Sequence, residues 1–231
     1  MQEIRGFLAN FDFVYLGLLV LSAVAVLVCM TVHELCHGLA AYLLGDTTAK
    51  RAGRLTLSPL AHIDWLGFAL MLVARVGWAK PVPVNVRKFK RPKRDMAITA
   101  AAGPVSNFVL ALVSLLLGSL ILTLNAGQFG GAVEWILFFL CSVAVMSVGL
   151  GLFNLIPIPP LDGSKLLFSV LPDRLYRGYL HYERYLLLVV VALAWFGIFS
   201  GPLGTLMSWV LERLCTLTRF PFWYIQYSFG V

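Results

Sequence analysis

Residues 13–44 read FVYLGLLVLSAVAVLVCMTVHELCHGLAAYLL, a long and mostly apolar run. A helix of that length would be roughly 48 Å long, which exceeds the ~30 Å hydrocarbon core of a bilayer. Its first two thirds are apolar, and its ionisable residues His33, Glu34 and His37 lie in the last third. The stretch therefore predicts a membrane-spanning helix whose C-terminal end tilts, breaks or projects into the interface.

The composition of the whole chain agrees with a membrane protein. Hydrophobic residues make up 60% of the 231 residues and charged residues 13%, whereas soluble domains average about 45–50% and about 25%. Disorder, coiled coil and collagen are excluded by the same values. We expect an all-α polytopic membrane protein with four to six transmembrane helices. It should form one membrane-embedded domain over 1–231, with a core at 13–170 and C-terminal helices at 183–219.

Three further spans are predicted after the first, over 97–124, 131–156 and 185–199. Asp95 is a plausible N-cap for the second of them. Residues 203–218 fit either another span or an interfacial helix, and a short amphipathic helix is expected after Asp162.

An irregular region, 45–95, separates the first two spans. RLTLSPL at 54–60 alternates like a short strand, and the apolar run 65–74 is too short to cross a bilayer. KPVPVNV at 80–86 cannot be helix interior because its prolines remove hydrogen-bond donors. These features predict a small re-entrant or interfacial β element between the first and second main spans.

Charge predicts the orientation of the chain in the membrane. The formal net charge is +7, and most of the 18 Lys and Arg residues lie in 45–95. The positive-inside rule then puts 45–95 and 157–184 in the cytoplasm. Nucleic-acid binding is not expected, because no basic folded module remains once the spans are counted. His33, Glu34, His37 and Asp162 would all lie toward the cytoplasmic side.

HELCH at 33–37 is an H-E-x-x-H motif on a helix. His33 and His37 lie one turn apart on one face, where both imidazoles can reach one Zn²⁺. Glu34 lies about 100° around the helix and can take a proton from a metal-bound water. A chance match with buried, hydrogen-bonded histidines is the alternative, but ionisable residues inside a span are costly and usually functional.

A catalytic zinc usually has three protein ligands, so a third must lie elsewhere in the chain. Asp162, in NLIPIPPLDG at 154–163, follows the third span and should lie on the side of the motif. Gly163 would free the backbone beside this carboxylate. Asp162 could instead cap the helix that follows it. Asp64 and His62 are weaker ligand candidates.

Together these motifs resemble the site-2 protease family of intramembrane zinc metalloproteases. The resemblance rests on HELCHG, on AGPVSN at 102–107 and on NLIPIPPLDG, and it covers 13–170 well. GRLTLSPLAHID at 53–64 and GWAKPVPVN at 77–85 are similar to the compact members without PDZ or CBS domains.

The resemblance implies a role for each motif residue. His33, His37 and Asp162 would bind one Zn²⁺ per chain, and Glu34 would be the general base. Asn154 matches a family asparagine that helps to hold the substrate carbonyl or oxyanion, although hydrogen bonding between helices is an equal alternative. A structural role is favoured for Asn107. The 80–86 tract resembles an edge strand that could pair with an unwound substrate.

The expected function is hydrolysis of a peptide bond in or near a transmembrane segment of a protein substrate, close to the cytoplasmic face. The chain would be a multi-pass protein of the prokaryotic plasma membrane, with the lipid bilayer as its other partner. Two alternatives stay open: a non-catalytic zinc-binding membrane scaffold, and a membrane-anchored peptidase that cuts soluble peptides. The sequence does not indicate the oligomeric state.

Overall fold

The computed structural model describes residues 13–65, 80–171, 186, 189–190, 192–193 and 195–231. Three of the described helices are long and apolar enough to cross a membrane: α2 (Phe13–Leu43), α5 (Pro92–Leu124) and α6 (Gly131–Asn154). The shortest, with 24 residues, would be about 36 Å long. The chain is therefore a multi-pass membrane protein, as predicted.

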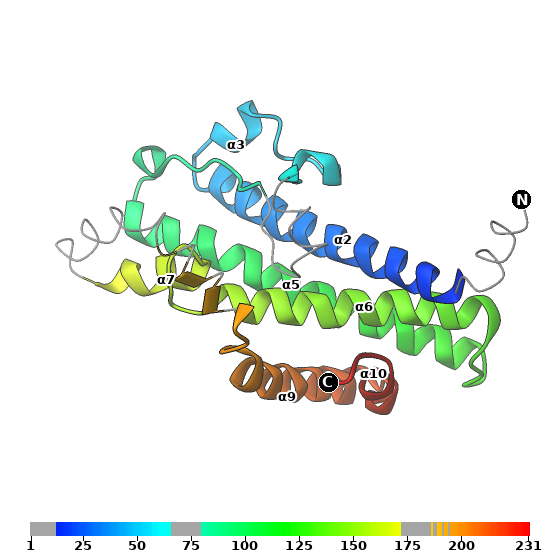
Figure 1. Ribbon diagram of the computed structural model, residues 1–231. Helices are drawn as coiled ribbons and strands as arrows, with labels where there is room; N and C mark the ends of the chain where they lie inside the picture. The colour runs from blue at the N-terminus through cyan, green and yellow to red at the C-terminus, as the bar shows by residue number, and fades with distance from the viewer. Residues whose placement is uncertain (1–12, 66–79, 172–185, 187–188, 191, 194) are drawn as a thin grey trace, which may run out of the picture.

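The three long helices pack against one another in every pairing (Figure 1). The C-terminal end of α2, the N-terminal end of α5 and the C-terminal end of α6 lie at the same end of the bundle (Figure 1). The short helix α7 (Asp162–Val170) packs against α5 at this end. Up-down-up topology thus brings residues 33–37, 99–107 and 162 together, and we call this part of the bundle the site end.

The opposite part of the bundle holds the main apolar core. Here α5 and α6 pack against α9 (Ser200–Thr218), and α10 (Phe222–Phe229) adds aromatic side chains. Leu115, Leu137 and Leu211 are completely buried in this core. A hydrophobic cluster of this size holds the ends of α5 and α6 that are remote from the site.

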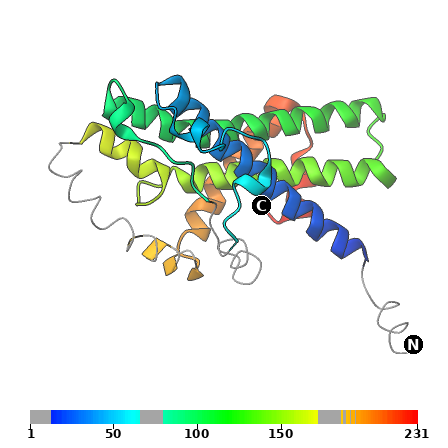
Figure 2. The same cartoon turned by 90° about the horizontal axis from the view of Figure 1, so that it is seen from above.

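Helix α2 crosses the α5–α6 pair obliquely, so that its N-terminal part leaves the bundle (Figure 2). Its contact with α6 is made by small buried residues, Ala25 and Cys29, against Val143. Phe13, Val14 and other large apolar residues of its first turns are exposed and suited to contact with lipid. All four cysteines are free.

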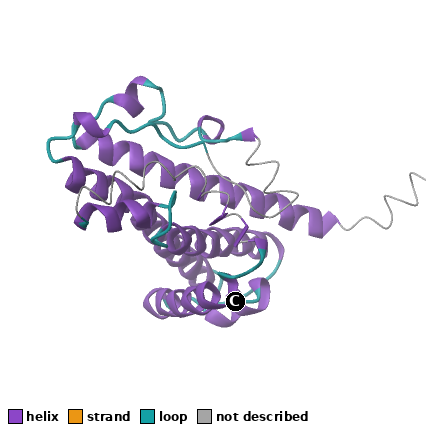
Figure 3. Ribbon diagram, turned by 60° about the vertical axis from the view of Figure 1, so that its left-hand side comes forward, coloured by secondary structure: helices purple, strands orange, loops and turns teal. Residues whose placement is uncertain are grey.

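The predicted β element is wrong for the residues that the structure describes. Apart from an isolated β-bridge at Ile63, they form no strand (Figure 3). Residues 54–60 form bends that end in the 3₁₀ turn η1 (Pro59–Ala61), because Pro59 opens that turn. Residues 80–85 are a loop that leads into η2 (Val86–Lys88). The predicted re-entrant run 65–74 lies, except for Trp65, outside the described residues.

Two helix boundaries also differ from the predictions. Helix α5 begins at Pro92, so Asp95 is not its N-cap. Asp95 instead sits in the first turn, where its Oδ2 accepts the Arg91 N–H at 2.9 Å. Helix α6 ends at Asn154, two residues before the predicted end.

The predicted number of spans is only partly supported. Three described helices are long and apolar enough to span a bilayer, and α9 is not among them. The predicted span 185–199 lies partly outside the described residues. The short helix α3 (Thr48–Arg51) follows α2 in the sequence and covers its C-terminal end (Figure 1).

Candidate metal centre

Helix α2 carries the first two side chains of the site. His33 and His37 are one turn apart and lie on the face of α2 that meets α5 and α7, so both are buried, with 5% and 9% of their surface exposed. Their ring planes are nearly perpendicular, with ring centroids 4.6 Å apart. The helical spacing therefore brings the two imidazole edges to one point, as the motif predicted.

The third side chain reaches this point through the turn that follows α6. Asp162 is the first residue of α7 and lies after the N-cap, Leu161, so the alternative of an N-cap role is wrong. Gly163 makes this turn possible because the backbone of Leu155 and Ile156 lies directly against it. A Cβ at residue 163 would overlap the Leu155 carbonyl oxygen. The glycine is thus required by close approach of two backbone segments, and not by a left-handed conformation.

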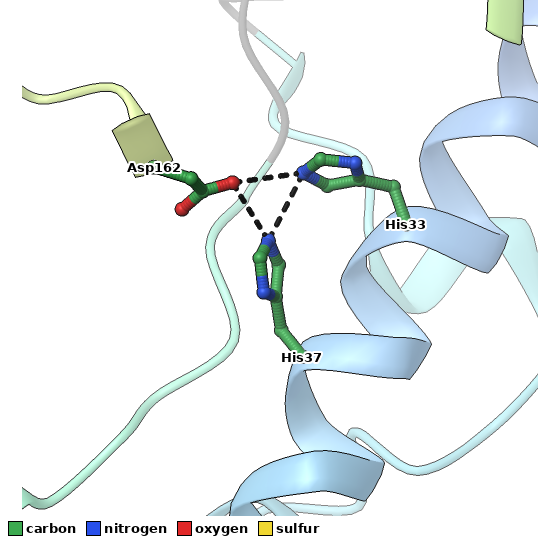
Figure 4. A group of neighbouring side chains, drawn as sticks. All are labelled: His33, His37 and Asp162. Carbon is green, nitrogen blue, oxygen red and sulfur yellow. Dashed lines mark hydrogen bonds and ion pairs between the residues drawn. The ribbon is translucent and has the colours of Figure 1, made fainter. Parts of the chain in front are cut away.

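Three polar atoms meet at the centre of the cluster (Figure 4). Asp162 Oδ2 is 3.2 Å from His33 Nε2 and 2.9 Å from His37 Nε2. The two Nε2 atoms are 3.0 Å apart. The structure therefore brings the three predicted metal ligands together from α2 and α7, which are far apart in sequence.

Helix α5 supplies the partners of the other imidazole nitrogens. His37 Nδ1 lies 2.7 Å from the Thr99 carbonyl oxygen, and His33 Nδ1 lies 3.1 Å from the Asn107 side-chain amide. Outer partners of this kind fix the orientation of metal-binding histidines. Sequence reasoning missed the role of Thr99 and favoured only a structural one for Asn107. The recurrence of polar and small residues at every fourth position of α5 was the signal that the sequence contained.

Gly103 lies between Thr99 and Asn107 on α5 and leaves room for both rings. A Cβ at this position would overlap His37 Nε2 and would lie 2.7 Å from His33 Cε1. Only a residue without a side chain allows α5 to approach the cluster this closely. The AGPVSN motif thus contributes a bare helix surface to the site.

The donor set fits a cation. A carbonyl oxygen can only accept, so His37 Nδ1 must donate to Thr99, and the Nε2 of a neutral ring then presents a lone pair to the centre. Without a metal, burial would raise the pKa of the Asp162 carboxyl, but the imidazole N–H groups that donate to it and the Lys165 ammonium hold it well below its usual range. A bound cation would take the place of those imidazole hydrogens. The three acceptor atoms thus lie about as close together as the ligand atoms of a tetrahedral zinc, which are about 3.3 Å apart.

Lys165 contacts the outer oxygen of the same carboxylate. Its Nζ lies 3.0 Å from Asp162 Oδ1, one helical turn along α7. Asp162 therefore presents one oxygen to the imidazoles and the other to an ammonium group. This arrangement keeps the carboxylate ionised and fixes which oxygen faces the centre.

Glu34 lies beside the cluster and is not one of its members. Its Oε2 accepts the backbone N–H of Val82 at 2.9 Å. Among the described residues no hydrogen bond to Glu34 Oε1 occurs, and the side chain is partly exposed. A carboxylate with one tethered and one open oxygen is suited to accept a proton, as a general base must.

The segment 80–85 is held in place by side chains of the site end. Asp46 Oδ2 accepts the Asn85 N–H at 2.6 Å, and the Lys80 N–H donates to the His62 carbonyl oxygen at 2.9 Å. Val82 is buried, whereas its neighbours Pro81 and Pro83 are exposed. The tract is therefore extended along the bundle with the alternation of a strand, although it pairs with no other strand among the described residues.

The remaining candidates lie away from the cluster. Asn154 Nδ2 donates to the Leu150 carbonyl oxygen of its own helix at 2.9 Å, and no hydrogen bond joins it to the three ligands. His62 Nε2 pairs with the Thr56 carbonyl oxygen at 3.0 Å. Among the described residues, the only cluster with metal-ligand geometry consists of His33, His37 and Asp162, so neither His62 nor Asp64 belongs to it.

Comparison with known proteins points to one family. The model of Peptidase family M50 matches residues 21–132 and 117–197. YwhC of Bacillus subtilis, named as a candidate zinc metalloprotease, is 37% identical over 194 residues, which cover 84% of this chain and 86% of YwhC. Rip2 of Mycolicibacterium smegmatis, named in the same way, is 31% identical over 225 residues, 89% of this chain and 82% of Rip2.

A third relative comes from an archaeon. MJ0611 of Methanocaldococcus jannaschii, also named as a candidate zinc metalloprotease, is 30% identical over 148 residues, 64% of this chain and 69% of that protein. No solved structure matches the chain. The resemblance inferred from the motifs is thus confirmed, and the chain belongs to Peptidase family M50, the site-2 protease family.

Proposed function

We propose that this protein is an intramembrane zinc endopeptidase that cuts a peptide bond in or near a transmembrane segment of its substrate. The observation that carries the proposal is the convergence of His33 Nε2, His37 Nε2 and Asp162 Oδ2 beside Glu34. The family and the names of its members support a zinc metalloprotease. The intramembrane substrate is supported by the position of the cluster between long apolar helices.

His33, His37 and Asp162 would hold one Zn²⁺ per chain. When bound at such a site, zinc polarises a substrate carbonyl and lowers the pKa of its water to about 7. Lys165 and the α5 contacts keep the three ligand atoms in position before the metal arrives. Preformed ligands reduce the cost of ordering the site on binding.

Glu34 would move the proton. Its open oxygen, Oε1, accepts a proton from the attacking water and then delivers it to the amine nitrogen that leaves. The hydrogen bond from Val82 N–H to Oε2 holds the carboxylate in one orientation during both transfers. Asn154 is kept as a candidate for holding the substrate carbonyl, which would require its amide to leave the Leu150 carbonyl.

The 80–85 segment would hold the substrate in an extended form. A peptide bond within a helix is shielded by its own hydrogen bonds, so the substrate must unwind before it is cut. The Val84 N–H and the carbonyl groups of Val82 and Val84 have no hydrogen-bond partner among the described residues. These groups could pair with an unwound substrate by β-addition, next to the carboxylate that Val82 contacts.

The active site would face the cytoplasm. The basic residues of 87–94 lie at the start of α5, which is at the site end of the bundle. The positive-inside rule places this end at the cytoplasmic surface of the membrane. A prokaryotic plasma membrane would be the location, which the bacterial and archaeal relatives support.

A cleavage assay with matched variants tests the proposal. Zinc-loaded protein in liposomes is incubated with a panel of fluorogenic transmembrane peptides and with soluble peptides that carry the same cleavable sequences. We expect cleavage of membrane-embedded peptides, and a 10²–10⁴-fold lower rate for Glu34→Gln with unchanged zinc content. Preference for the soluble forms would indicate a membrane-anchored peptidase. Zinc binding without any cleavage would indicate a scaffold. Unchanged turnover in Glu34→Gln would contradict the role of Glu34 as general base.

A further inference from the structure

Asn107 is a completely buried polar side chain next to the metal centre. It is 0% exposed, and its Nδ2 lies 3.1 Å from His33 Nδ1. Its Oδ1 is buried and has no hydrogen-bond partner. The oxygen and nitrogen of an amide have nearly the same shape, so the chemistry of the partner must decide which of them faces His33.

The role of His33 as a ligand decides the orientation of this amide. An imidazole that binds a cation through Nε2 must have its lone pair there and its hydrogen on Nδ1. Nδ1–H can only donate, so the atom facing it must be an acceptor. If the amide is turned over, Oδ1 gains His33 as a partner and Nδ2 loses it. Both orientations therefore leave one buried amide group without a partner, and only the hydrogen on His33 Nδ1 distinguishes them.

The second histidine supplies an internal reference for this argument. His37 Nδ1 faces the Thr99 carbonyl oxygen, which can only accept, so this ring carries its hydrogen on Nδ1. The helices run in opposite directions, and α5 therefore offers its earlier residue to the later histidine and its later residue to the earlier one. The Asn107 side chain therefore faces His33 Nδ1 in the same way that the Thr99 carbonyl oxygen faces His37 Nδ1.

We infer that Asn107 is a positioning residue: its side-chain carbonyl oxygen accepts the Nδ1–H of His33 and fixes the tautomer that presents Nε2 to the metal. This inference rests on the zinc ligand role of His33 in the proposed function. A side chain serves this purpose because His33 Nδ1 faces the Asn107 amide, whereas His37 Nδ1 reaches a backbone carbonyl of α5. Outer partners of metal-binding histidines typically change metal affinity 10–100-fold.

Three variants separate this role from packing. Asn107→Asp keeps an acceptor and removes the donor, whereas Asn107→Leu keeps the volume and removes both. Ser114→Ala, farther along the buried face of α5, is the matched control. Zinc affinity is measured by chelator competition at pH 8, and thermal unfolding of the metal-free proteins reports folding. We expect 10–100-fold weaker zinc binding in the Leu variant, and wild-type or tighter binding in the Asp and Ala variants.

Two results of this experiment would overturn the inference. If Asn107→Leu binds zinc as tightly as the wild type, the amide does not position His33. If Asn107→Asp is weakened as much as Asn107→Leu, the amide acts as a donor to His33 and not as an acceptor.

A measurement without metal keeps the inference testable even if the protein binds no zinc, which would contradict the proposed function instead. ¹⁵N NMR of metal-free protein with labelled histidine reports which ring nitrogen of His33 carries the hydrogen. We expect a larger fraction of His33 rings with the hydrogen on Nδ1 in the wild type than in Asn107→Leu, because Asp162 and His37 face Nε2 in both proteins. An equal or smaller fraction in the wild type overturns the inference independently of zinc.

Discussion

The buried face of α5 changes character halfway along the helix. From Asp95 through Thr99 and Gly103 to Asn107, it meets its neighbours through hydrogen bonds or bare backbone. From Ala111 onward the same face packs into the apolar core, for example at Leu115. One helix therefore builds a site with its first half and a scaffold with its second, and the two halves should respond differently to mutation.

The largest expected effect is removal of a ligand at the site end. In Asp162→Ala the carboxylate that faces both imidazoles is lost, and Lys165 loses its partner. We expect zinc affinity to fall by more than the roughly 10–100-fold that loss of an outer partner costs, and peptidase activity to fall with it. Metal analysis of the purified protein and chelator competition measure this. Asp64→Ala is the control, and loss of zinc there instead would contradict the ligand assignment.

A pair of glycine variants compares the two halves directly. Gly103→Ala places a methyl group against His37 Nε2, and Gly118→Ala places one 2.9 Å from the Phe220 ring. Overpacking typically costs about 1–3 kcal/mol at either position. Only Gly103→Ala is expected to weaken zinc binding, by at least about 10-fold, since it alone displaces ligands. Chelator competition and thermal unfolding measure both effects; equal zinc affinity in the two variants would erase the distinction between the halves.

Truncation in the apolar half should lower stability and leave the metal centre intact. Leu115 is completely buried between α5 and its neighbours. Leu115→Ala should lower the free energy of unfolding by about 2–5 kcal/mol, because the cavity loses packing contacts. Denaturant titration in detergent measures this, and zinc affinity of the folded fraction should equal that of the wild type. A large loss of zinc affinity would mean that the two halves are coupled.

The smallest expected effect is a pH dependence confined to the site end. Burial would raise the pKa of Asp46, but hydrogen bonds from Thr48 and Asn85 and the Lys88 ammonium hold it below its usual range. A lowered folded-state pKa contributes stability above the unfolded value of about 3.9, and this contribution is lost as the pH falls below it. Asp46→Asn should therefore cost about 1.5–3 kcal/mol at pH 7.

Unfolding of wild type and Asp46→Asn over pH 3–8 measures this contribution. The difference between the two proteins should be constant above about pH 5 and should shrink as the carboxyl of the wild type becomes protonated. A variant in the apolar half, such as Leu115→Ala, should show no such narrowing. A constant difference for Asp46→Asn down to pH 3 would contradict the assignment.

The ligands could be predicted from the sequence because their chemistry is carried by side chains. Two histidines one turn apart in an apolar helix, and an aspartate at the end of a later span, are costly to bury in a membrane unless they bind something. The contributions of Thr99 and Gly103 could not be predicted in the same way. One acts through its backbone and the other through the absence of a side chain, and both depend on how α5 is rotated toward α2.

The errors in predicting the fold have a similar origin. Alternation at 54–60 and prolines at 81 and 83 are compatible with strands, but a strand also needs a neighbour to pair with. In the described residues side chains of Glu34 and Asp46 take that place. Asp95 has the chemistry of an N-cap, yet Pro92 begins the helix earlier because its fixed φ suits the first turn.

The contact of Gly163 with the backbone of Leu155 also has a genetic consequence. Every missense change of this codon adds at least one carbon atom that would overlap the Leu155 carbonyl oxygen. Alanine, the mildest replacement elsewhere, should therefore be as damaging here as a bulky residue. Allelic series at this codon should show a single phenotype, the loss of the metal centre, with no graded intermediates.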